Sequence, residues 1–180
     1  MKDEAHIVRL LESNQIALAV TAISEQYHEI LYWHIRKLVK QHDLADDVLQ
    51  NTYLRIFKGL KGFGFKSSIK TWCYRIAYNE SMRELQKNQA LKKAATHTES
   101  KDYFATLTAD PYFDLDSVSH AFHESLLGLP EKQQQIFQMK YFDELTFEEI
   151  ARITSWNINS IKTGFYAAKE KIKHKLTATV

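Results

Sequence analysis

Cysteine, proline and glycine are scarce in this sequence. Its 180 residues include 1 Cys, 2 Pro and 5 Gly. Gly and Pro mark turns, and no β-branched run of strand length is flanked by turn signals, so the sequence predicts helices rather than strands. The single cysteine, Cys73, excludes an internal disulfide and is typical of proteins in a reducing compartment.

Long apolar runs are absent as well. The longest hydrophobic run is far below membrane-spanning length. The first residues, MKDEAHIVRLLESNQ, carry acidic side chains at once and lack the apolar segment of a signal peptide. Hydrophobic residues make up 44% of the chain, which is ordinary for a folded protein and excludes wholesale disorder. We therefore expect a cytoplasmic protein without membrane insertion.

Acidic side chains are missing from one window. The whole chain has 22 acidic and 24 basic residues, yet no acid lies between Asp47 and Glu80. The same window holds several basic residues, namely Arg55, Lys58, Lys61, Lys66, Lys70 and Arg75. A polyanionic partner is the simplest explanation, because an ordinary solvated helix does not account for the missing acids.

Apolar residues recur at three- and four-residue spacing in two parts of the chain. Residues 4–40 indicate two helices, 42–63 a third, and a fourth begins at Ser67 or Ser68 and continues to about residue 90. The periodicity fails around Pro111 and returns afterwards. We expect an all-α chain with two small helical domains, 1–88 and 118–180, joined by a flexible linker at 89–117.

The second domain contains a predicted helix-turn-helix. Thr146 and Glu149 have the spacing of a capping box, which starts a short helix over 147–153. Asn157 then caps a longer, basic helix, and such a second helix can lie in a DNA major groove. Its candidate DNA-contacting residues are Asn157, Asn159, Ser160, Lys162, Thr163 and Lys169. A helical hairpin with a lysine-rich end also occurs in proteins that do not bind DNA, so this segment alone leaves both interpretations open.

The helix expected at residues 69–83 has two different faces. Trp72 shares an apolar stripe with Ile69, Cys73 and Ile76, so we interpret it as a core residue. The other face has cations for phosphates, tyrosines for stacking on unpaired bases, and an amide for a base edge. Its residues are Lys70, Thr71, Tyr74, Arg75, Tyr78, Asn79 and Arg83. The preceding loop, GFGFKSS, suits a pocket for an extruded base, with Lys66, Ser67 and Ser68 as candidate contacts.

The order of these motifs resembles that of bacterial RNA polymerase sigma factors of the extracytoplasmic-function (ECF) class, in the sigma-70 superfamily. The resemblance is carried by ADDVLQNTYLRIFKGL, FGFKSSIKTWCYRIAYN, LPEKQQQIFQMKYFDELTFEEIARI and NSIKTGFYAAKEKI. It implies a transcription initiation factor that recognises the −35 promoter element as duplex and the −10 element as a melted single strand. The implied partners are core RNA polymerase and promoter DNA, and many members of the class also bind an anti-sigma factor.

Residue roles follow from the resemblance by position. The clamp-binding helix of the family covers Asp47, Gln50, Asn51 and Leu54. Lys66, Ser67 and Ser68 fall in the loop that captures a flipped −10 base, and Asn79 lines that pocket. The stretch 160–163 matches the start of the −35 recognition helix.

The sequence departs from the family pattern at three positions. Asn51 stands where the clamp helix usually has an acid, which alters the polar contacts expected there. Gly164 and Ala167 stand where the recognition helix often has arginines, so we expect weaker phosphate anchoring or an unusual −35 sequence. A glycine within a helix also costs about 1 kcal/mol of helix stability.

Two other classes of protein are alternative interpretations of the sequence. A stand-alone helix-turn-helix transcriptional regulator accounts for the second domain but leaves the acid-free window without a role. A metal enzyme could take its ligands from His42, Asp46 and Asp47, or from His120, His123 and Glu124. His120 and His123 lie beside the linker with no further ligand pair, and chance placement on the surface is the better account. No phosphate loop and no nucleophile–base pair is visible. We expect no catalytic residue, no metal and no cofactor.

Overall fold

The computed structural model describes residues 4–94 and 117–178, and every regular element in these ranges is a helix. In chain order they are α1 (Glu4–Glu12), α2 (Ile16–Val39), α3 (His42–Gly59), the 3₁₀ helix η1 (Leu60–Gly62), α4 (Ile69–Ala94), α6 (Ser117–Leu127), α7 (Glu131–Tyr141), α8 (Phe147–Thr154) and α9 (Ile158–Ala178). The all-α prediction is confirmed. No helix in the described ranges is long and apolar enough to cross a membrane.

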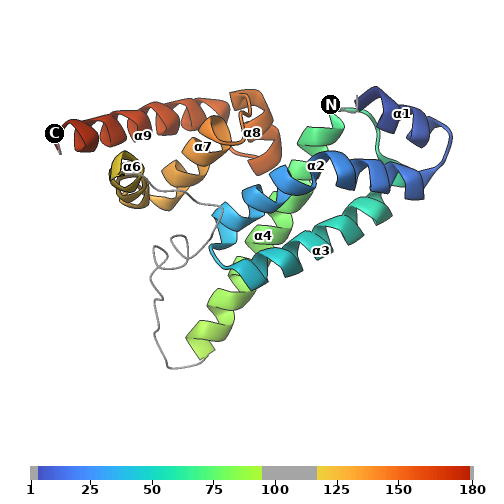
Figure 1. Ribbon diagram of the computed structural model, residues 1–180, viewed down its shortest axis with the longest axis horizontal. Coiled ribbons are helices and arrows are strands. Elements are labelled where there is room, and N and C mark those ends of the chain that lie inside the picture. Colours follow the sequence, from blue (N-terminus) through green and yellow to red (C-terminus); the bar gives the residue numbers. More distant parts are fainter. Residues whose placement is uncertain (1–3, 95–116, 179–180) are drawn as a thin grey trace. The chain divides into compact units, whose positions relative to one another are not determined.

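The chain divides into two compact units, Met1–His97 and Thr98–Val180. Unit 1 contains α1 to α4 with η1, and unit 2 contains α6 to α9 (Figure 1). Helix α4 continues to Ala94, past the predicted domain boundary at residue 88. Most of the predicted linker lies outside the described residues.

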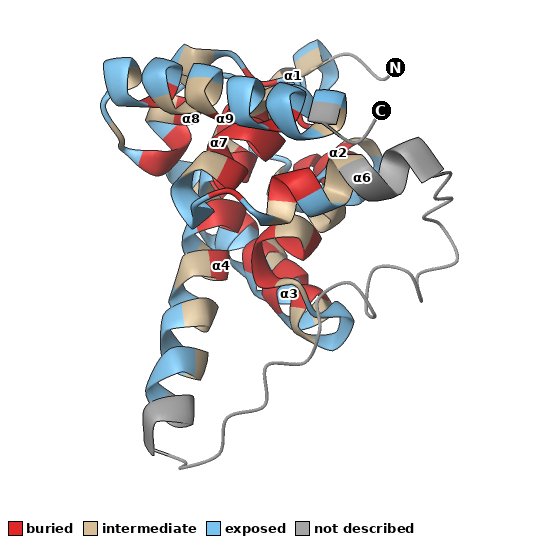
Figure 2. Cartoon of the chain, turned by 90° about the vertical axis from the view of Figure 1, so that its left-hand side faces the viewer, coloured by how far each residue is buried: buried red, intermediate tan, exposed pale blue. Residues whose placement is uncertain are grey.

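Unit 1 is a bundle in which α2, α3 and α4 pack against one another and α1 packs on α2. Its core takes apolar residues from each of these helices, including Ile7, Ile23, Leu31, Ile56 and Cys73, all at most 1% exposed. Burial of one such aliphatic side chain contributes about 1.5–3 kcal/mol. In Figure 2 buried positions follow the sides of the helices that face one another, and exposed positions follow the outer sides.

A short loop connects η1 to α4. Ser68 caps α4, since its Oγ accepts a hydrogen bond from the Thr71 backbone N–H at 3.0 Å, as the sequence predicts for Ser67 or Ser68. Gly59, at the end of α3, permits the close approach of Trp72. A Cβ added at Gly59 would lie 3.0 Å from the Trp72 indole.

Unit 2 is built around α9, which packs against α6, α7 and α8. Leu126, Leu129, Phe137, Ala168 and Ile172 form one of its cores. One face of α9 is held by these apolar contacts, and the opposite face lies in solvent.

The helix-turn-helix is present as predicted. The Thr146 hydroxyl accepts from the Glu149 N–H at 3.1 Å, and the Glu149 carboxylate accepts from the Thr146 N–H at 2.8 Å, which completes the capping box. Ser155 ends α8 in the left-handed conformation, with φ 61°. Asn157 then caps α9, because its Oδ1 accepts from the Asn159 N–H at 2.9 Å.

Candidate functional site

One face of α3 presents the four residues assigned to polymerase binding. Asp47, Gln50, Asn51 and Leu54 are all exposed, at spacings of three and four residues that place them on a single stripe. Val48, Leu49 and Ile56 on the other side of the helix are buried in unit 1. The sequence pattern groups Leu54 with the apolar side, but 57% of it is exposed. A single exposed leucine is ordinary on a protein surface, so its neighbours decide whether it belongs to an interaction site.

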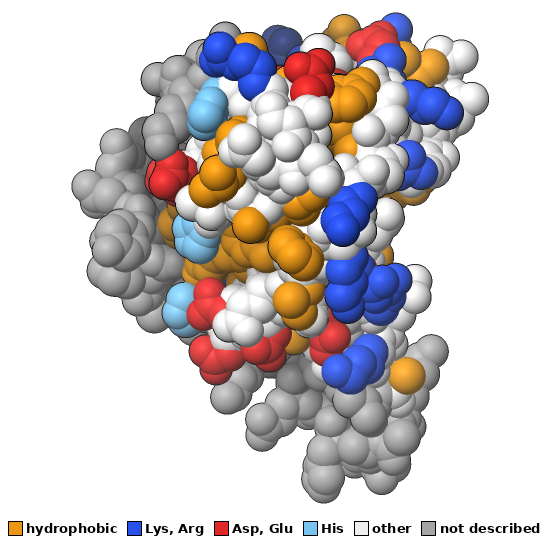
Figure 3. All heavy atoms as spheres, turned by 90° about the vertical axis from the view of Figure 1, so that its right-hand side faces the viewer, with side chains coloured by type: hydrophobic (Ala, Val, Ile, Leu, Met, Phe, Trp, Pro, Cys, Tyr) orange, Lys and Arg blue, Asp and Glu red, His pale blue; other side chains and the backbone are white. Residues whose placement is uncertain are grey.

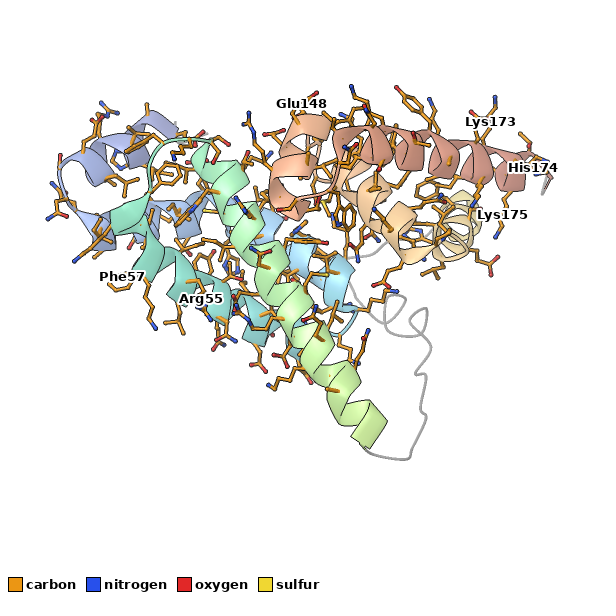
Figure 4. All side chains as sticks on the ribbon, turned by 180° about the vertical axis from the view of Figure 1, so that it is seen from behind. Arg55, Phe57, Glu148, Lys173, His174 and Lys175 are labelled. Carbon is orange, nitrogen blue, oxygen red and sulfur yellow. The ribbon has the colours of Figure 1, made fainter. Side chains whose placement is uncertain are left out.

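The apolar part of this face is larger than the sequence indicates. Phe57, one turn beyond Leu54, is 51% exposed and points away from the other helices of unit 1 (Figure 4). Leu18 of α2 is 56% exposed and lines an open groove together with Phe57, Lys58 and Lys61. Figure 3 shows hydrophobic and basic side chains side by side on the surface of this part of the molecule. Sequence analysis missed Phe57 because helical periodicity alone assigns it to the core.

The loop between η1 and α4 carries a cluster of aromatic rings. The Phe63 ring lies 4.9 Å from the Phe65 ring and 5.2 Å from the Trp72 ring, centroid to centroid. Phe65 is 53% exposed and has a left-handed backbone, with φ 52°. Trp72 is half-buried rather than fully in the core. Sequence analysis did not select Phe63 and Phe65, although two aromatics alternating with glycine in a loop are a recognisable signal.

Polar candidates surround this aromatic cluster. Lys66 and Ser68 of the loop are exposed, and Ser67 is half-buried, with its hydroxyl donating to the Ser68 carbonyl at 3.2 Å. Arg75 and Asn79 of α4 are exposed and four residues apart, so they lie on one stripe of the helix.

Arg83 continues this stripe but is paired. Its guanidinium donates to the Glu80 carboxylate at 2.5 Å, and Arg55 of α3 lies 3.4 Å from the same carboxylate. Glu80, which ends the acid-free window, therefore neutralises part of the basic charge at this end of the surface. The assigned role of Arg83 in DNA binding stays a prediction.

Tyr74 and Tyr78 were expected on an open face, together with Lys70. The structure corrects this for both tyrosines, because α4 packs against two helices. Tyr74 is 1% exposed, and its ring meets the His34 ring of α2 edge-on at 4.8 Å. Tyr78 is 6% exposed and Thr71, expected on the same face, is 3% exposed. The Lys70 ammonium lies 5.8 Å from the centre of the Tyr74 ring. The stacking roles assigned to Tyr74 and Tyr78 both stay predictions.

The exposed face of α9 carries the candidates of the second unit. Asn157, Asn159, Ser160, Lys162, Thr163 and Lys169 are all exposed. The amide oxygen of Asn157 is already used as the helix cap, so its NH₂ group is the part that remains for a ligand.

Tyr166 belongs to the same face and was missed. It is 57% exposed and lies one turn after Lys162, whose ammonium is 6.0 Å from the centre of the Phe147 ring. The four-residue spacing from Lys162 places Tyr166 on the same face of the helix, and this spacing is visible in the sequence. Gly164, one of the departures noted above, lies against α7, where an added Cβ would come within 2.9 Å of Ile136 Cδ1.

No cluster of three or more His, Cys, Asp or Glu with metal-binding geometry occurs in the part of the chain that the structure describes. His42 lies 3.8 Å from Asp46, and its Nδ1 is 2.7 Å from the Tyr32 hydroxyl. The His42–Asp46 pair lies within α3, and the Tyr32–His42 hydrogen bond is an exposed contact between α2 and α3. His120 lies outside the residues whose side chains are described.

Comparison with known proteins matches both units to one family. Residues 23–91 match sigma-70 region 2, and residues 119–172 match sigma-70 region 4. RNA polymerase sigma factor SigV of Bacillus subtilis (strain 168) is 29% identical over 161 residues, which cover 89% of this chain and 92% of SigV. ECF RNA polymerase sigma factor SigW of the same organism is 25% identical over 186 residues, which cover 98% of this chain and 97% of SigW.

Solved structures share the fold. The sigma factor RpoE from Bartonella quintana, in complex with the anti-sigma factor NepR, superposes with a TM-score of 0.71 at 21% identity, over 87% of this chain and 96% of RpoE. CnrH, in complex with the cytosolic domain of CnrY, superposes with a TM-score of 0.67 at 15% identity, over 99% of both chains.

Two helical units that match regions 2 and 4 in this order define an RNA polymerase sigma factor. The chain belongs to the sigma-70 family, in its ECF class. It is a DNA-binding, polymerase-binding transcription initiation factor that directs RNA polymerase. A stand-alone helix-turn-helix regulator is not favoured, because region 2 accounts for the first unit.

Proposed function

We propose that unit 1 binds core polymerase and captures the melted −10 strand, and that unit 2 reads the −35 element as duplex DNA. The observation that supports this most directly is the surface at the start of α4. The exposed ring of Phe65 lies there with the half-buried rings of Phe63 and Trp72, and hydroxyls and cations accompany them in a part of the chain without acidic residues. Single-stranded DNA is held by this combination of stacking platforms and positive charge.

The polymerase contact is assigned to the α3 stripe of Asp47, Gln50, Asn51 and Leu54, extended by Phe57. The stripe combines acceptors, amides and an exposed apolar end. A protein interface gains affinity from apolar anchors surrounded by polar groups that fix the register. Asn51 supplies an uncharged amide where the family usually has an acid, so its contact relies on hydrogen bonding rather than on charge.

The −10 contact is assigned to the loop 63–68 with Asn79, Arg75 and Lys70. Phe65 and Trp72 present rings on which bases can stack, a role that the sequence predicts for Tyr74 and Tyr78. Lys66, Ser67 and Ser68 supply donors for a base edge or a phosphate. Arg83 contributes when promoter phosphate competes with Glu80 for its guanidinium.

The −35 contact is assigned to the start of α9. Asn159, Ser160 and Thr163 offer hydrogen bonds to base edges, while Lys162 and Lys169 offer charge to phosphates. Tyr166 adds an aromatic contact on the same face. All the proposed sites on this protein are binding surfaces. We propose that the protein opens DNA with binding energy and performs no catalysis of its own.

We further propose an anti-sigma factor as a partner. The support is the fold shared with RpoE, whose structure contains the anti-sigma factor NepR. A protein that forms a stable complex with the free chain and blocks its transcription in vitro would bear this out. A chain that transcribes fully in extracts of its own cells, with no such inhibitor at any growth stage, would argue against it.

Run-off transcription with purified core polymerase tests the central proposal. The chain with core polymerase should yield discrete transcripts from genomic fragments, and neither component alone should do so. A chain that binds the same fragments specifically without polymerase, and gives no transcript with it, would contradict the proposed division of roles.

A further inference from the structure

The N-terminal helix α1 reaches the start of α4 through one side chain. Ile7 anchors α1 in the core of unit 1, at 1% exposure. One turn earlier, a carboxylate oxygen of Glu4 accepts a hydrogen bond from the backbone N–H of Ile69. The two residues are 65 positions apart in sequence, and Ile69 is the first residue of α4.

The contact completes the cap of α4. The first N–H groups of a helix have no partner within the helix. Ser68 takes the N–H of Thr71, and Glu4 takes the N–H of Ile69. A carboxylate at this end of a helix is also favoured by the helix dipole.

Glu4 is half-buried, and its charge acts on side chains of α2 and α4. Burial raises the pKa of Tyr27 in α2, and the negative charge of Glu4 raises it further. The same two causes, in the same order, raise the pKa of Cys73 in α4. The half-buried carboxylate is therefore close to both helices as well as to the loop.

The loop 63–68 is held at both ends. At its start the Phe63 N–H donates to the Leu60 carbonyl at 3.1 Å, and the Phe63 ring packs on Trp72. At its end the Ser68 cap and the Glu4 carboxylate fix the first turn of α4. A binding loop selects its ligand sharply only when its supporting contacts hold it in one geometry.

We propose that Glu4 is a positioning residue for −10 recognition, which holds the end of the base-binding loop through the Ile69 N–H. This inference rests on the proposed role of the loop and adds α1 to the promoter-reading apparatus. The contact acts through Ile69 and Ser68, and Glu4 itself touches no base.

The test compares base discrimination by holoenzymes reconstituted with wild-type chain, Glu4→Ala, Glu4→Gln and Glu12→Ala. Each is incubated with a pool of single-stranded DNA carrying a randomised window, and bound strands are sequenced. Glu4→Gln keeps an acceptor oxygen. Glu12→Ala removes an exposed acid from the other end of α1 and controls for net charge.

We expect wild type and Glu12→Ala to select the same motif. Loss of a charged hydrogen-bond partner changes an equilibrium constant by about tenfold or more, so Glu4→Ala should lower the enrichment of the preferred base by about that factor. Glu4→Gln should fall between Glu4→Ala and wild type. A purely structural role would lower the thermal midpoint and leave the selected motif unchanged in the folded protein. If Glu4→Ala is not folded at the assay temperature, Glu4→Asp, which is one methylene too short for the contact, takes its place.

The outcomes distinguish the proposed function of the loop from the proposed positioning role of Glu4. Absence of any motif with wild-type holoenzyme would overturn the proposed function of the loop. A clear wild-type motif that Glu4→Ala reproduces at full strength would overturn the positioning role alone. An equal loss in Glu12→Ala would also overturn it, since the effect would then come from charge and not from the Ile69 contact.

Discussion

The indole ring of Trp72 lies 5.2 Å from the ring of Phe63, centroid to centroid, and packs against Gly59 at the end of α3. One ring thus joins the core of unit 1 to the loop proposed to bind the −10 base. A half-buried tryptophan in this position supports the fold on one side and offers a surface for stacking on the other.

Trp72→Ala should therefore affect both stability and DNA opening. We expect a loss of about 2–3 kcal/mol in the free energy of unfolding of unit 1, below the range for a fully buried ring. Denaturant unfolding followed by circular dichroism measures the loss. Trp72→Phe keeps a ring beside Phe63 and should recover most of it. An unchanged unfolding curve for Trp72→Ala would show that the ring contributes nothing to the packing.

Polymerase binding gives the second prediction. The double change Gln50→Ala with Leu54→Ala removes an amide and the exposed apolar side chain from the α3 stripe. Co-purification with core polymerase should be abolished, because a few anchor residues carry most of the affinity of an interface. Circular dichroism should be unchanged, since both side chains are exposed. Gln86→Ala, an exposed change on α4, serves as the control and should bind as wild type does.

Helix α9, proposed to read the −35 element, gives the third prediction. Lys162→Ala should lower promoter-dependent transcription and reduce the salt dependence of DNA binding by about one counterion if the contact is to phosphate. Lys173→Ala removes the same charge near the other end of α9 and should change the salt slope less. The same slope and the same transcription for Lys162→Ala and wild type would assign the α8–α9 hairpin a structural role only.

The buried thiol gives the fourth prediction. Burial raises the pKa of Cys73, and the Glu4 charge raises it further, so the folded protein holds the thiol protonated. A thiol reagent at about pH 8 should react slowly with the native chain and quickly after denaturation. Because the unfolded thiol ionises near a pKa of about 8.5, stability should fall as the pH rises through that value. Fast labelling of the native protein would show that the core of unit 1 opens readily.

Local features of the fold were predictable because they depend on short spacings. The capping box of Thr146 and Glu149 and the cap at Asn157 involve residues two to three positions apart, and the structure has both. The burial of Tyr74 was not predictable in this way. It depends on α4 lying against both α2 and α3, which widens the buried face beyond one helical stripe.

The candidate site was predictable only where it depends on residues close together in the sequence. The acid-free window predicts where exposed cations gather on α3 and the start of α4, and periodicity predicts which face of each helix is buried. Phe57 and Tyr166 were missed because an aromatic residue has the same pattern whether it faces a core or a partner. The Glu4–Ile69 contact joins two distant segments, and no periodicity in either segment records it.

The last prediction concerns Asn79, which is exposed on α4 in line with Arg75. Extrusion of a base costs a few kcal/mol of unstacking, which the pocket must return through hydrogen bonds and stacking. Asn79→Ala removes the amide and leaves the cations that are proposed to bind duplex DNA. It should therefore impair promoter opening more than formation of the closed complex. Permanganate footprinting on duplex promoters measures opening, and filter binding at low temperature measures the closed complex.

A pre-melted bubble template separates the two contributions of Asn79. The bubble removes the cost of melting, so it should rescue Asn79→Ala in part, while the loss of base discrimination persists because the amide is still absent. Gln86→Ala, which is exposed further along α4, should open both templates as wild type does. If Asn79→Ala opens duplex promoters as well as wild type and tolerates the same −10 substitutions, the pocket does not use this amide. The absence of acids between Asp47 and Glu80 would then reflect a generally basic surface that attracts DNA without reading it.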